Sequence, residues 1–119
     1  MGGMEKRFTS FAEFWPYYVS QHRDPTCRRL HFVGTSIAIG CVAVSPVFPP
    51  ALVAAPVFGY GLAWIGHLAF EKNKPASWRS AKHFWWSLKG DLRMWRMTIV
   101  GDMAAEVERV EDELGLVAA

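Results

Sequence analysis

The sequence predicts an all-α protein: an integral membrane helical hairpin with flanking amphipathic helices. Residues 30–70 contain no Asp, Glu, Lys or Arg, whereas each surface helix of a water-soluble domain needs a charged face. This segment is long enough for two stretches of about 20 residues, the length that crosses a bilayer. Prolines at positions 46, 49 and 50 divide it near its middle. The 119 residues are expected to form a single membrane-embedded domain.

The first expected element is an aromatic-faced amphipathic helix over residues 8–21. Its large side chains recur at spacings of three and four, which is the helical period: Phe8, Phe11, Phe14, Trp15 and Tyr18. Thr9 or Ser10 is the expected N-cap, with Glu13 completing a capping box. Pro16 either kinks this helix or marks a fresh start in its first turn. A polar connector, residues 21–29, follows.

The membrane hairpin is expected over about residues 28–46 and 51–71. The first helix ends near Val44, because a residue that precedes proline is pushed out of helical geometry. Pro56 lies either in the first turn of the second helix or at a kink in it. If that helix is regular only after Pro56, it reaches just about 22 Å. The hairpin is then either spanning or re-entrant.

Basic residues flank the hairpin at both ends, and its tip has no charge. They are Lys6, Arg7, Arg23, Arg28 and Arg29 before it, and Lys72, Lys74, Arg79, Lys82, Lys89, Arg93 and Arg96 after it. The positive-inside rule therefore predicts a multi-pass membrane protein with both termini in the cytoplasm, in the inner membrane if the source is bacterial. Contact with anionic lipids explains this charge, and no nucleic-acid partner is expected.

The segment after the hairpin is predicted to lie at the membrane interface and to end in an amphipathic helix. Trp78, Trp85 and Trp86 lie among Lys and Arg, a composition typical of the interface. The last helix is expected over about residues 91–114, with one apolar stripe. That stripe either packs against the N-terminal helix or forms the seam of a homodimer.

The histidines suggest a site at the cytoplasmic mouth of the hairpin. His31 and His67 are each eighteen residues from residue 49, so in an antiparallel hairpin they face each other at one level. His22 lies in the connector on the same side, and Glu71 follows His67 by about one helical turn. His83 lies among aromatic residues and is interpreted as interfacial.

Three imidazoles and a carboxylate are suitable ligands for iron, zinc or copper. Histidines with a carboxylate and open coordination positions favour non-haem Fe(II) and oxygen chemistry. A single histidine at a helix end is more often an interfacial hydrogen-bonding group, but ionisable groups at membrane depth are costly and usually functional.

Three sequence segments resemble a known family. They are Tyr18-Val19-Ser20-Gln21-His22-Arg23-Asp24-Pro25, Leu30-His31-Phe32-Val33-Gly34, and Ile65-Gly66-His67-Leu68-Ala69-Phe70-Glu71 followed by Pro75-Ala76. Over roughly residues 11–95 the chain is similar to the family of the fungal 2-hydroxy fatty acid dioxygenase of phytosphingosine breakdown, including its bacterial branch. The resemblance implies a membrane-embedded Fe(II) enzyme of fatty acid α-oxidation. Such an enzyme uses O2 to shorten a 2-hydroxy fatty acid by one carbon.

The resemblance also implies roles for individual residues. His22, His31 and His67 match the metal ligands, with Glu71 as a fourth ligand or as a partner that bonds to one of them. Asp24 and Cys27 stand where many members have asparagine, and Asp24 is expected to hydrogen-bond a ligand histidine. Glu71 and Asp24 are the expected catalytic carboxylates.

Four residues are candidates for substrate contact. Arg28, Arg29 or Lys72 is expected to pair with the substrate carboxylate. Tyr60 shares a helix stripe with His67. The expected partners are therefore a fatty acyl substrate, O2 and membrane lipids.

The alternative function is a non-enzymatic membrane hairpin module that binds lipid or a partner protein. In that case the histidines bond only to one another and to water. A zinc-dependent hydrolase or a desaturase-like enzyme is a weaker third interpretation, because desaturases contain more histidines than this chain.

Overall fold

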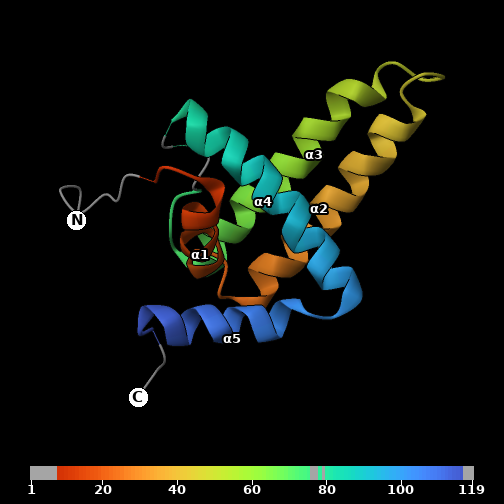
Figure 1. Ribbon diagram of the computed structural model, residues 1–119. Coiled ribbons are helices and arrows are strands. Elements are labelled where there is room, and N and C mark those ends of the chain that lie inside the picture. The colour runs from red at the N-terminus through yellow and green to blue at the C-terminus, as the bar shows by residue number, and fades with distance from the viewer. Residues whose placement is uncertain (1–7, 76–77, 79, 117–119) are drawn as a thin grey trace.

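The computed structural model describes residues 8–75, 78 and 80–116, and in this part of the chain every regular element is a helix (Figure 1). In chain order they are α1 (Phe11–Ser20), α2 (Pro25–Val44), α3 (Ala51–Ile65), the π-helix η2 (Gly66–Glu71), α4 (Ala81–Val100) and α5 (Met103–Leu114). The all-α prediction is confirmed. Two segments, Pro25–Val44 and Ala51–Glu71, are long and apolar enough to cross a membrane.

Helix α1 begins at one of the two predicted caps. The Ser10 hydroxyl accepts a hydrogen bond from the backbone N–H of Glu13 at 3.2 Å. In return, the Glu13 carboxylate accepts from the backbone N–H and the hydroxyl of Thr9, both at 3.0 Å. Such reciprocal bonds satisfy donors that a helix start leaves unpaired. The helix then continues through Pro16 to Ser20.

The aromatic face of α1 forms the main core together with α4 and α5. Phe14, Trp15, Tyr18 and Val19 are almost completely buried, and α5 passes beneath α1 in Figure 1. They pack with further buried residues from the segment before α1, from α4 and from α5, namely Phe8, Met94, Met103, Val107 and Val110. The C-terminal helix thus packs on α1, one of its two predicted roles.

The C-terminal region differs from the single helix predicted over residues 91–114. Helix α4 begins ten residues earlier, at Ala81, where Ser80 provides its N-cap. It ends at Gly101, whose φ of 86° lies in the left-handed region that favours glycine. The backbone N–H of Asp102 bonds back to the carbonyl of Met97 at 2.9 Å. This turn redirects the chain, and α5 is a separate helix.

Helices α2 and α3 form the predicted hairpin, with an earlier start than expected. The Asp24 carboxylate caps α2 by accepting from the N–H groups of Thr26 and Cys27. Pro25 occupies the first helical turn, where its missing N–H costs nothing. Gly34 allows the two helices to approach closely, because a Cβ there would lie 3.0 Å from the carbonyl oxygen of Phe58.

The last six residues of the second hairpin arm adopt a wider turn than the rest. η2 continues α3 to Glu71 and ends at Lys72, whose φ is 61°. Gly66 lies against the first turn of α2, since a Cβ there would be 3.0 Å from the Cys27 sulfur. π-helical turns are rare and occur frequently at functional sites, and this one contains His67.

Much of the hairpin's apolar surface is not covered by the rest of the protein. Val47 at the tip is 86% exposed, and Val53 on α3 is 71% exposed. A contiguous apolar surface of this kind is typical of regions covered by lipid or by another protein.

The contact between α1 and α5 is expected to weaken in acid. Glu106 accepts from the Trp15 indole N–H at 2.7 Å and pairs with Arg109. The bonds from Arg109 lower the pKa of Glu106 from 4.5 to about 2. A carboxyl whose pKa is lowered by folding stabilises the fold above its unfolded pKa, and this contribution disappears as the pH falls through the folded pKa. We therefore expect the midpoint of thermal unfolding to fall between pH 4.5 and pH 2.

The Glu106→Gln variant is the control, because its side chain does not titrate. Circular dichroism melts at a series of pH values should show a smaller acid-dependent decrease for the variant than for the wild type. Equal decreases would contradict this role of Glu106.

Candidate metal centre

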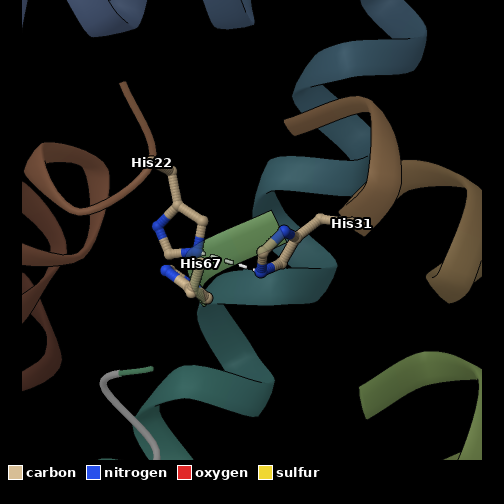
Figure 2. A group of neighbouring side chains, drawn as sticks. All are labelled: His22, His31 and His67. Atoms are coloured by element: carbon tan, nitrogen blue, oxygen red, sulfur yellow. Dashed lines mark hydrogen bonds between the residues drawn. The ribbon is translucent and has the colours of Figure 1, made fainter. Parts of the chain in front are cut away.

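Three histidines from three different segments meet at the base of the hairpin (Figure 2). His22 follows α1, His31 lies on α2 and His67 lies on η2. Their side chains are 1%, 4% and 2% exposed. One ligating nitrogen from each ring lies within 4.8 Å of the other two. The structure thus brings together the three histidines that the sequence singled out.

In each of the three rings, Nδ1 lies within hydrogen-bond distance of an oxygen acceptor. His22 Nδ1 lies 2.6 Å from the carbonyl oxygen of Tyr18, and His31 Nδ1 lies 2.9 Å from that of Cys27. His67 Nδ1 lies 2.7 Å from the side-chain oxygen of Asn73. Amide oxygens only accept hydrogen bonds, so each Nδ1 must carry the proton. In the neutral ring, the lone pair is then on Nε2.

With each Nδ1 bonded to an oxygen, the Nε2 lone pairs of His22 and His31 face each other. The Nε2 atoms of His22 and His31 are only 3.1 Å apart (Figure 2). Two facing lone pairs repel unless a proton or a metal cation lies between them. Burial lowers the pKa of His22, and the neighbouring His31 and His67 lower it further. The charged form of His22 is therefore disfavoured, and a metal ion is one partner that could stabilise the facing lone pairs.

The space beside the rings is small and partly polar. The histidines border a cavity of about 20 Å³, which is enough for one water-sized ligand. Neutral imidazole nitrogens, each with its second nitrogen bonded to a carbonyl or amide oxygen, are the usual form of metal-bound histidine. This cluster could therefore hold a metal ion with a position left for another ligand.

The two predicted catalytic carboxylates bond to the backbone of the connector. Glu71 accepts from the backbone N–H of Asp24, and the Asp24 carboxylate caps α2. Neither belongs to the group of ligating atoms found among the described residues. Together they attach the connector, and hence His22, to both arms of the hairpin.

The predicted substrate-binding residues occupy different positions. Tyr60 lines the cavity beside the histidines. Arg28 donates to the carbonyl oxygens of His22 and Arg23, both at 2.8 Å, and lines a narrow crevice with His31. Arg29 and Lys72 are exposed, and neither is among the described residues that border the histidine cavity.

His83 lies outside the cluster. Its ring bonds to the Ser80 hydroxyl at 2.8 Å and packs edge-on against Phe14.

Sequence reasoning missed three residues that support the histidines. Asn73 bonds to His67 and also donates to the carbonyl oxygen of Gln21. The Tyr18 ring stacks on His22 with centroids 4.1 Å apart, and its hydroxyl donates to Asp91. Burial raises the pKa of Asp91 to about 7.

One sequence signal could have identified the contact between Tyr18 and Asp91. Gly90 precedes Asp91 in the middle of α4, and a Cβ at Gly90 would lie 3.1 Å from the Tyr18 ring. A glycine inside a helical pattern is often kept for such close packing.

The fold and site together define a class: an all-helical protein with an apolar hairpin and a buried three-histidine group able to hold a metal ion. The sequence matches the family described as 2-hydroxy-palmitic acid dioxygenase Mpo1-like over residues 8–103. The chain therefore belongs to this family, in agreement with the resemblance seen in its motifs. No curated protein and no solved structure shows a significant match.

The Asn73 contact provides a test of the metal centre. Replacing Asn73 with Ala removes the acceptor that holds the His67 ring and its tautomer, so we expect metal affinity to fall about 10- to 100-fold. Titration of the purified protein with Co(II), followed by visible absorption, measures the affinity. Lys74→Ala, a change at an exposed neighbour, should leave it unchanged. An unchanged affinity in Asn73→Ala would contradict the role of this contact.

Proposed function

We propose that this protein is an Fe(II)-dependent membrane dioxygenase that shortens 2-hydroxy fatty acids by one carbon, with O2 as the oxidant. The observation that carries this proposal is the convergence of one ring nitrogen from each of three buried histidines, within 4.8 Å of one another. The description of the family supports the substrate class.

The donor set fits iron(II). Three neutral imidazoles leave open coordination positions, as does the set of two histidines and one carboxylate in non-haem Fe(II) oxygenases. When bound, iron(II) supplies the redox chemistry with O2 that carbon–carbon bond cleavage requires. The histidines hold the ion, and their burial excludes bulk water from its surroundings.

The residues around the cluster have separate proposed roles. Arg28 is the best placed of the three basic candidates for the substrate carboxylate, because it donates to the carbonyl oxygen of His22, whereas Arg29 and Lys72 are exposed. Glu71 and Asp24 hold the connector in position. Tyr18 and Asp91 form a hydrogen-bonded pair that can hold or release a proton next to His22.

We infer that the α2–α3 hairpin inserts into the membrane with both of its ends on the cytoplasmic side. The apolar exposed surface of the hairpin and the basic residues at its two ends support this orientation. The histidine cluster then lies near the cytoplasmic mouth, within reach of an acid whose chain lies in the bilayer.

Metal content is the first test. The protein is purified in detergent without chelator or nickel affinity, as wild type, His31→Ala/His67→Ala and His83→Ala. We expect about one iron per chain in the wild type and in His83→Ala, and none in the double variant. Mass spectrometry with plasma ionisation measures the metal.

Activity on a 2-hydroxy fatty acid then tests the reaction. O2 uptake and a product one carbon shorter are expected in the wild type. In His67→Ala we expect both to fall by about 100-fold or more. Zinc in place of iron would favour a hydrolase, and no metal even after anaerobic addition of Fe(II) would favour a non-enzymatic membrane module.

A further inference from the structure

A larger cavity lies between α2, α3 and α4, on the tip side of the histidines. Its volume is about 360 Å³, within the range of about 300–1,000 Å³ that is typical of ligand pockets. Most of its lining is apolar and includes Ile39, Val42, Ala55, Leu88 and Leu92. Among the described residues that line it, Asp91 is the one with an acidic or basic side chain.

This apolar cavity adjoins the space beside the histidines. Tyr60 and Asp91 line both, so the two spaces share a polar boundary. Asp91 is also the acceptor of the Tyr18 hydroxyl, and Tyr18 stacks on His22. The polar end of a ligand in the cavity would therefore lie at the boundary next to the rings.

The cavity extends away from the histidines toward the hairpin tip. On α2 its lining residues run from Thr35, one turn beyond His31, to Val42. Val42 is eleven residues from His31, or about 16 Å along the helix. At the far end its wall is open, because Val42 is 51% exposed. An apolar chain can enter there directly from apolar surroundings.

We propose that this cavity holds the acyl chain of the substrate, with the methyl end of the chain beside Val42 and Ala55. The inference rests on the proposed function and extends it to residues remote from the metal. Filling the tip side of the cavity is then expected to exclude long chains while short chains still fit.

The first test changes the far end of the cavity. Val42→Trp fills the space at the tip side, whereas Val44→Trp adds the same ring two residues on, at a position 46% exposed that does not line the cavity. For a graded series of 2-hydroxy fatty acids, we expect Val42→Trp to shift the ratio of kcat/KM for long against short chains by about tenfold or more, toward short chains. Val44→Trp should not change this ratio. Turnover with an unchanged ratio in Val42→Trp would overturn the assignment while leaving the proposed reaction intact.

The second test requires neither turnover nor a folded variant. Wild-type protein in phosphatidylcholine nanodiscs, without added metal, is photolysed with a 2-hydroxy fatty acid that has a diazirine near its methyl end. Peptide mass spectrometry locates the adducts. We expect them near Val42 and Ala55, and we expect an excess of unlabelled acid to suppress them.

The outcomes separate the two proposals. Suppressible labelling at the cavity without any turnover would support the chain site and contradict the reaction. Labelling spread over the exposed face of α3, at Val53 and Val57, and unaffected by the competing acid would show ordinary contact with bilayer lipid. That result would overturn the acyl-chain site.

Discussion

The site depends on three hydrogen bonds that point outward. Because each Nδ1 of His22, His31 and His67 donates to an oxygen, each Nε2 must present a lone pair to the centre. Burial then disfavours protonation, and the three rings could hold a metal ion between them. Much of the surrounding structure maintains this arrangement. The core around α1 places Tyr18, the cap of α2 places Cys27, and the end of η2 places Asn73.

The aromatic core that α1 forms with α4 and α5 and the apolar α2–α3 hairpin therefore have different functions. The buried aromatic residues of α1, packed on α4 and α5, hold one side of the cluster, while the hairpin arms provide two of the three rings. The contact between Glu71 and Asp24 joins these halves next to the rings. A site assembled in this way lies between a buried aromatic core and an apolar hairpin with an exposed surface, which suits a ligand that has one polar and one apolar end.

The sequence was sufficient to predict the three-histidine cluster because the relative positions of the histidines follow from the geometry of an antiparallel hairpin. Equal distances of His31 and His67 from a proline-rich tip define one level of an antiparallel hairpin, and the connector places His22 there. Other features depend on packing that a linear pattern does not contain. Asp91 lies in a charged stretch that resembles a solvated face, and only the close contact of Gly90 with Tyr18 shows that it is covered. Likewise, the apolar stripe of the last helix continues in phase across Gly101, so periodicity alone concealed the turn there.

The anchors of the rings have a consequence for how the centre forms. Each acceptor lies close to its histidine in sequence, four residues away for His22 and His31 and six for His67. The acceptor that orients each ring therefore lies in the same local segment as the ring, and Asn73 also bonds to Gln21 in the connector. Since short-range contacts form early at small entropic cost, a nascent chain presents ligands already in the tautomer that captures a cation.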